Sequence, residues 1–339
     1  MNEPHPPNPS ATAASLPDYK DRSTGLTVFG ILTILLGGLC GLLVPLMLAS
    51  LVMPARNPQV PVNPMAVLPG AFIYGGLAVA LIWLGIGSLS ARRWARALLL
   101  IFSWTWLIVG LFIAGIMPFL MAKIFASLPP DARTGKPALP PEAIPIMIAV
   151  MVVFFGMFFI VMPAFWTFFY SSRHVKATCE ARDPVPGWTD ACPLPVLGFV
   201  LWTAAAVPMM LVLPLTGHAV MPFFGQFITG LPCALFCLVV AVVWGLAAWW
   251  LYRLEVRGWW LILFAMALFV MSALLTYAHH DLSEMYQLQG LPPAQIDQLQ
   301  KLGLFTGNRL SWFTALCSLP FLGYLLFIKK YLWKGSDQN

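Results

Sequence analysis

Long apolar runs separated by short polar segments dominate the chain. Six runs are free of charged residues for about 18 residues or more, the length that spans roughly 30 Å of hydrocarbon, and two more reach it when their ends are included. The runs lack the period-two alternation of a barrel strand, so we expect helices. The predicted membrane spans are 26–53, 69–90, 97–122, 144–170, 194–216, 231–252, 259–277 and 309–328.

Composition agrees with this pattern. Of the 339 residues, 60% are hydrophobic and only 9% are charged, whereas a soluble domain of this size needs more charge to cover its surface. The predicted fold class is therefore an all-α integral membrane protein with eight transmembrane helices.

Basic residues predict the orientation. With the N-terminus inside, 13 of the 19 Lys and Arg fall in inside segments and 6 in outside segments. Positive charge is retained on the cytoplasmic side, so we expect both termini in the cytoplasm and the protein in the cell (inner) membrane. The same bias explains the pI near 9.1, so we expect no nucleic acid partner.

The first 25 residues are rich in proline and small polar residues and cannot bury enough surface to fold. We expect 1–25 to be a disordered cytoplasmic tail and 333–339 a short one. Because no basic segment precedes a short apolar run and a cleavage site, we expect an uncleaved signal anchor in the first span.

The two halves of the chain share a pattern that predicts an internal duplication. At an offset of 168, identical pairs are Val28/Val196, Gly30/Gly198, Leu43/Leu211, Val44/Val212, Val52/Val220, Met53/Met221 and Pro54/Pro222. At an offset of 161 they are Leu77/Leu238, Val79/Val240, Ala80/Ala241, Trp83/Trp244, Arg92/Arg253, Arg96/Arg257, Leu100/Leu261 and Ile101/Ile262.

We therefore expect a first four-helix repeat at 26–170, a cytoplasmic linker at 171–193 and a second four-helix repeat at 194–332. Each repeat has an even number of spans, so the copies enter the membrane in the same orientation, as two tandem parallel repeats. The recurring arginines, Arg92 and Arg96 with Arg253 and Arg257, are then cytoplasmic anchors rather than an active site.

The predicted span interiors contain no Asp, Glu, Lys, Arg, His, Asn or Gln, only hydroxyl residues. Proton relays and coupling-ion sites ordinarily need an ionisable or strongly polar group at depth, which disfavours a proton-driven transporter. The sequence also lacks the motifs of intramembrane proteases, P-loop nucleotide sites and dinucleotide sites. We expect no enzyme, no catalytic residues and no cofactor.

One polar cluster follows the seventh span, comprising His279, His280, Asp281 and Glu284, with His218 in an earlier outer loop. Imidazole and carboxylate groups suit zinc, but adjacent histidines point apart on a helix. The favoured interpretation is an interfacial helix end that Asp281 or Ser283 caps, without metal. A pair of amphipathic helices over 278–308, packed on the bundle itself or on a partner, follows from the helical spacing of its apolar residues.

Two of the six cysteines, Cys179 and Cys192, lie in the linker, where a reducing cytoplasm disfavours a disulfide. With His174 they could offer metal ligands, but their spacing matches no compact zinc motif. The other four lie in or near spans, where cysteine is an ordinary small apolar side chain.

These features favour a non-enzymatic scaffold, accessory subunit or sensor, whose partners are the lipid bilayer and other membrane proteins. The alternative is a channel or transporter for a weakly polar solute that is not coupled to protons. A third hypothesis is a membrane enzyme with a metal at the His279 cluster. Substrate and oligomeric state do not follow from the sequence.

Overall fold

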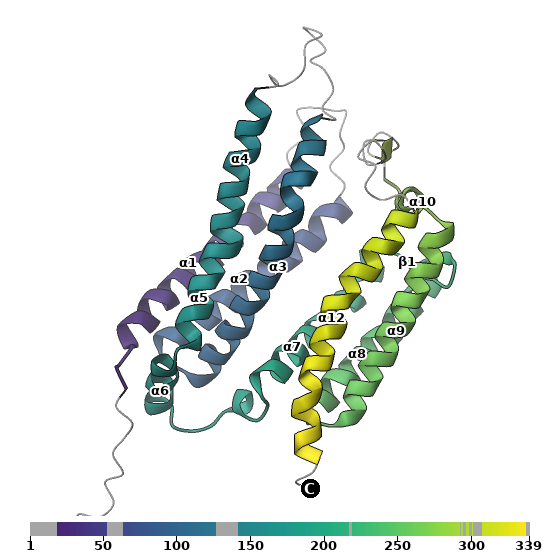
Figure 1. Ribbon diagram of the computed structural model, residues 1–339. Coiled ribbons are helices and arrows are strands. Elements are labelled where there is room, and N and C mark those ends of the chain that lie inside the picture. Colours follow the sequence, from purple (N-terminus) through teal and green to yellow (C-terminus); the bar gives the residue numbers. More distant parts are fainter. Residues whose placement is uncertain are drawn as a thin grey trace, which may run out of the picture.

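Eight helices long and apolar enough to cross a bilayer dominate the fold (Figure 1). The computed structural model describes residues 19–52, 64–126, 142–216, 219–291 and 307–336, with 293, 296, 297 and 300. The spanning helices are α1 (Ser23–Val52), α2 (Pro64–Leu89), α3 (Arg93–Ala126), the continuous α4 (Ala143–Gly156), η1 (Met157–Val161) and α5 (Met162–Ser171), then α7 (Leu194–Val212), α8 (Gly230–Tyr252), α9 (Val256–His279) and α12 (Gly307–Ser336). The prediction of an all-α membrane protein with eight spans is confirmed.

Short elements connect the spans. They are α6 (Arg173–Arg182) and η2 (Trp188–Asp190) in the linker, η3 (Leu213–Thr216) and the strands β1 (Val220–Phe223) and β2 (Gln226–Thr229) after α7, and α10 (Leu282–Leu288) after α9. Helix α10 confirms the first of the two amphipathic helices predicted over 278–308, and the second lies largely outside the described residues.

The spanning helices form two groups (Figure 1). In the first group α1 packs along α2 and α3 along α5, and in the second α7 packs along α8 and α9 along α12. The groups meet between α3 and α7, where the Trp202 indole donates a hydrogen bond to Thr105 Oγ1 at 2.8 Å. Both ends of the described chain lie at the same end of the helices, as an even number of spans requires.

Glycines bring α1 and α2 into close contact. A Cβ added to Gly30 would stand 3.0 Å from the carbonyl oxygen of Gly85, and one added to Gly85 would stand 2.8 Å from the carbonyl oxygen of Gly30. The two backbones therefore touch at this crossing, which only small residues allow.

The turns from α2 to α3 and from α8 to α9 have the same geometry. Each contains a residue other than glycine with positive φ, Ala91 at 50° and Leu254 at 59°. In both turns this residue donates to the carbonyl three positions back, and the next residue donates to the carbonyl five positions back, which satisfies the last carbonyls of the helix. The pairs are Ala91 to Ser88, Arg92 to Gly87, Leu254 to Leu251 and Glu255 to Trp250.

The fourth span contains a π-helical turn whose cause is a proline. Pro163 has no backbone N–H, so the carbonyl of Phe159, four residues earlier, lacks its usual helical donor. Residues Met157–Val161 adopt the wider π-helix at this point. The Phe159 carbonyl lies directly against Gly110 of α3, where a Cβ would collide with it.

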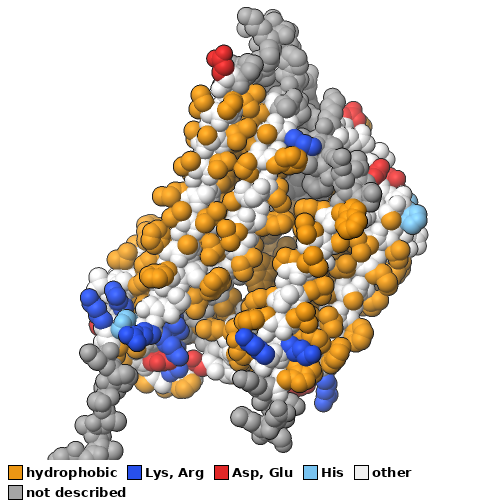
Figure 2. Space-filling model, in the orientation of Figure 1, with side chains coloured by type: hydrophobic (Ala, Val, Ile, Leu, Met, Phe, Trp, Pro, Cys, Tyr) orange, Lys and Arg blue, Asp and Glu red, His pale blue; other side chains and the backbone are white. Residues whose placement is uncertain are grey.

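The surface of the spanning region is largely hydrophobic, as expected for side chains that face lipid (Figure 2). Charged side chains gather at the two ends of the helices. Between the two groups of helices the molecule is hollowed, and the walls visible in this view are hydrophobic.

Candidate functional site

Hydroxyl groups are the main polar side chains buried among the spanning helices. Most of them donate to backbone carbonyls, namely Thr33 to Phe29, Ser88 to Leu26, Ser103 to Leu100, Thr203 to Phe199, Ser272 to Pro222 and Thr276 to Ser272. Thr167 differs, because its buried Oγ1 has no hydrogen-bond partner among the described residues. These hydroxyl protons are therefore used in hydrogen bonds to the backbone. The described helices contain no continuous chain of polar side chains across the membrane.

A two-stranded hairpin returns from α7 toward the outer part of α9. Strands β1 and β2 pair antiparallel around a two-residue turn, Phe224 and Gly225, with φ values of 41° and 93°. Positive φ at both central residues matches the twist of the flanking strands. The Phe224 N–H donates to Ser272 Oγ at 2.9 Å, and the Gly225 N–H donates to Thr276 Oγ1 at 3.1 Å.

These bonds explain how irregular backbone is tolerated inside the span. Ser272 lies seven residues, or about 10 Å of helix, from the end of α9 at His279. Lipid cannot satisfy backbone N–H groups at that depth, so the turn must be buried against protein donors and acceptors. Ser272 and Thr276 supply them, and Ser272 also donates to the Pro222 carbonyl at 3.1 Å.

His280 joins this hairpin to α10. Its Nε2 lies 3.0 Å from the carbonyl oxygen of Gly225, and its Nδ1 lies 2.6 Å from Oε2 of Glu284. Both partners are acceptors, so both bonds form together only when both ring nitrogens carry protons. The hydrogen bond that the His280 ring donates to Glu284 raises the pKa of His280 above 6.5, opposed by its partial desolvation.

The predicted polar cluster is thus only partly brought together. His280 and Glu284 are in contact, whereas His279 Nδ1 lies 2.9 Å from the Leu275 carbonyl oxygen, back along its own helix. Asp281 stands at the N-cap position of α10 without a side-chain capping hydrogen bond, and His218 lies outside the described residues. A metal would have to displace both partners of the His280 ring, and no group of three ligand side chains forms within the described ranges.

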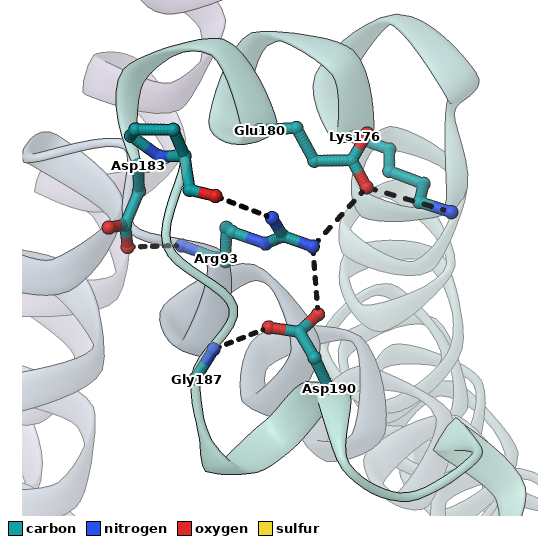
Figure 3. Close-up of polar contacts among 7 residues, drawn as sticks. Arg93, Lys176, Glu180, Asp183, Gly187 and Asp190 are labelled. Carbon is teal, nitrogen blue, oxygen red and sulfur yellow. Dashed lines mark hydrogen bonds and ion pairs between the residues drawn. The ribbon is translucent and has the colours of Figure 1, made fainter.

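The linker at the other end carries the densest ionic contacts (Figure 3). The carboxylate of Asp183 accepts a hydrogen bond from the backbone N–H of Arg93 at 3.2 Å, at the first residue of α3. The same carboxylate lies 3.4 Å from the guanidinium of Arg92. Helix N-termini leave backbone donors unpaired, so Asp183 caps α3 from a distant part of the chain.

Arg93 lies at the centre of the group in Figure 3. Its guanidinium lies 3.3 Å from Asp190 and 3.7 Å from Glu180, and donates to the Pro184 carbonyl at 3.5 Å. Asp190 in turn accepts from the Gly187 N–H at 2.9 Å, which closes the linker turn. Arg93 therefore holds the linker turn at 183–187 through Pro184 and Asp190.

The linker cysteines are buried side chains of the core. Cys179 is 1% exposed and lies with Val175 on the buried face of α6, and Cys192 is 4% exposed in the core of the second group. Burial raises the pKa of each thiol to about 11. Low-pKa thiolates are the reactive form, so these thiols are suited to packing rather than to nucleophilic chemistry. Both are free thiols.

A lipid-facing cavity of about 260 Å³ lies between α3 and the fourth span, next to the π-helical turn. Its lining is almost wholly apolar and comprises Ala114, Met117, Pro118, Met121, Ile148, Met151, Val152, Phe155, Gly156 and Ile160. Pro118 lacks the N–H that the Ala114 carbonyl would accept, so the continuous helix α3 lacks one backbone hydrogen bond beside the cavity.

Comparison with known proteins finds no relative. No protein-family model, no curated protein and no solved structure matches the chain.

Sequence reasoning missed the most specific contacts of both sites. Asp183, Ser272 and Thr276 each accept a hydrogen bond from the backbone of another segment, a contact that the sequence pattern does not predict. One local feature of the sequence could have indicated the role of Asp183. Its carboxylate stands beside Pro184 in a short linker that is rich in basic residues. No local signal marks the hairpin, because Phe224-Gly225 is not a typical hairpin turn sequence and Pro222 disfavours a strand.

Proposed function

We propose that this polytopic membrane protein is a non-enzymatic component of a membrane assembly, a scaffold, accessory subunit or sensor. The observation that carries the proposal is the use of polar groups: buried hydroxyls in the described spans bond to backbone, and charged contacts gather at the helix ends. A protein that moves ions or protons needs strongly polar groups at depth. Packing with lipid and with other membrane proteins does not need strongly polar groups at that depth.

The proposed architecture is two tandem parallel four-helix repeats with both termini in the cytoplasm. Matching contacts support the repeat. Thr33 donates to the Phe29 carbonyl and Thr203 to the Phe199 carbonyl, an offset of 170, and the turns at Ala91 and Leu254 correspond at an offset of 163.

A tyrosine of the last helix forms a hydrogen bond to another helix of the same half in both halves. Tyr170 lies 2.7 Å from Ser88 Oγ, which donates to the Leu26 carbonyl, and Tyr324 donates to the Pro195 carbonyl. The threonine and turn correspondences, at offsets of 170 and 163, favour a register two residues away from the alignment at 168 and 161. In that register Arg92 corresponds to Glu255 instead of Arg253.

Purification of the full chain from native membrane in mild detergent, followed by mass spectrometry, tests the proposed role. We expect one or a few membrane proteins to copurify in constant ratio. A matched preparation carrying a charge-conserving change on the lipid-facing surface, such as Leu235→Met, controls for non-specific capture. Repeated isolation without any partner would contradict the proposal.

The second candidate is a channel or transporter for a weakly polar solute. The hydrophobic hollow between the two groups of helices favours it, because a path lined by apolar side chains suits such a solute (Figure 2). Flux of a weakly polar solute into proteoliposomes tests this function. A cross-link between Cys residues introduced at Phe112 and Phe313, whose rings lie 6.4 Å apart, should block the flux if the hollow is the path.

A further inference from the structure

Four of the eight basic residues described at the linker end of the first group of helices are paired with carboxylates. Arg92 lies 3.4 Å from Asp183, and Arg93 lies 3.3 Å from Asp190. Lys176 contacts Glu180 and Arg182 contacts Asp21 in the same way. Figure 2 shows blue and red side chains intermingled at this place. Half of these cations are therefore used in ion pairs within the protein itself.

The same end of the second group is different. Arg253, Arg257, Lys329 and Lys330, together called the second basic end, are all exposed. The described part of the chain provides none of them with a carboxylate within ion-pair distance, and Figure 2 shows blue side chains predominating there. Its net positive charge is thus left for an external anion.

Aromatic rings hold these cations in place without neutralising them. The Lys329 ammonium lies 5.4 Å from the ring centroid of Trp259 and 4.8 Å from that of Trp333. Trp259 is 3% exposed and donates its indole N–H to the Leu325 carbonyl at 2.8 Å, so it is a fixed platform. Ring faces attract a cation through their quadrupole, but the positive charge persists.

Apolar surface continues from these cations toward the middle of the membrane. Leu326 and Phe327, one turn deeper on α12, are 59% and 45% exposed. Trp249 and Trp260 are also exposed at this end, at the level where indole rings favour the headgroup region. A ligand that fits both surfaces has an anionic head and a hydrocarbon chain.

We propose that the second basic end binds the headgroup of an anionic phospholipid, with the acyl chain along α12. The retention of basic residues on one side of a membrane explains the number of cations, but it does not explain why the four cations of the second basic end lie beside exposed aromatic and apolar side chains without a carboxylate partner in the described part of the chain. Basic groups between helix ends are a recognised physical match for anionic headgroups. This inference goes beyond the proposed accessory role and does not depend on it.

Native mass spectrometry of the full chain in mild detergent tests the proposal. The probe is an equimolar mixture of phosphatidylglycerol and phosphatidylcholine with identical acyl chains. We expect the protein to retain phosphatidylglycerol preferentially and the Lys329→Gln, Arg257→Gln variant to lose about tenfold of that preference. The matched control is Lys20→Gln, Arg173→Gln, which removes two exposed cations from the same end of the first group.

The two double variants distinguish a specific lipid site from a general effect of surface charge. Loss of preference in the first variant alone supports the site, whereas equal loss in both variants shows only general surface charge and overturns it. Inorganic phosphate in large excess should leave phosphatidylglycerol bound. Displacement by phosphate would reveal a site for small anions and would also overturn the lipid assignment.

A measurement on the unaltered protein covers the case in which the variant does not fold. In nanodiscs of phosphatidylglycerol, Lys329 and Lys330 should be acylated several-fold more slowly than in nanodiscs of phosphatidylcholine. Lys20 provides the internal reference, because its rate should change much less. Equal rates for Lys329 and Lys330 in the two lipids would contradict the proposal.

Discussion

The carboxylate of Asp183 caps helix α3 by accepting a hydrogen bond from the backbone N–H of Arg93, at 3.2 Å and across 90 positions of sequence. This bond fastens the linker to the start of a membrane span. It also places the Arg93 side chain where it reaches Asp190 and Glu180. The linker that leads to the second group of helices is therefore fastened to the first group through this carboxylate.

Replacement of Asp183 by alanine should destabilise the protein by about 1 kcal/mol, the usual cost of losing an N-cap. Asp183→Asn should cost much less, because an amide oxygen can still accept from the Arg93 N–H. Thermal unfolding in detergent measures the difference. Cys179, 1% exposed beneath the linker, should react faster with a maleimide in the alanine variant. Equal effects of the two substitutions would show that charge, and not capping, holds the linker.

Gly110→Ala should destabilise the packing of α3 on the fourth span by about 1–3 kcal/mol, because the new methyl group would collide with the Phe159 carbonyl. That carbonyl is backbone and cannot rotate away. Gly115→Ala in the same helix is the matched control, since its Cβ would meet nothing within 4 Å. Fluorescence-detected size-exclusion chromatography after heating compares the two. A stable Gly110→Ala protein would rule out the close approach.

Ser88 and Tyr170 should show energetic coupling. The Tyr170 hydroxyl lies 2.7 Å from Ser88 Oγ, which donates to the Leu26 carbonyl at 3.0 Å. Ser88→Ala and Tyr170→Phe should each cost about 1–3 kcal/mol, since each leaves a buried partner unsatisfied. The double variant should cost less than the sum of the two. Denaturation of all four proteins measures the coupling, and Ser171→Ala, at an exposed hydroxyl of the same helix, should change little.

Stability of the hairpin end should depend on pH through His280. Its pKa is raised above 6.5 in the folded protein by Glu284, so the folded state binds the proton more tightly than the unfolded state. The stabilisation is complete below pH 6.5 and is lost as the pH rises through the raised pKa. His280→Gln should abolish this dependence while keeping a donor for Gly225. Melting temperatures from pH 5 to 8 measure it, and parallel curves for the two proteins would show that His280 does not titrate with folding.

The sequence alone determined the eight spans and their helical form. The reason is that hydrophobic length is a local property, and lipid requires each spanning segment to satisfy its own backbone. The described helices begin a few residues outside several predicted spans, as at Arg93 instead of residue 97, because polar residues at the membrane surface still form backbone hydrogen bonds. The absence of ionisable residues from the spans was also visible directly.

Only the tertiary structure decided which polar groups meet. Asp183 reaches Arg93 across 90 positions, and the hairpin turn reaches Ser272 from Phe224 across 48. The π-helical turn at Phe159 depends both on Pro163, which is visible in the sequence, and on Gly110, which makes room for it on another helix. Such contacts depend on how helices cross and face one another. In so apolar a chain many alignments share identities, so identities alone do not fix the register of the proposed repeat.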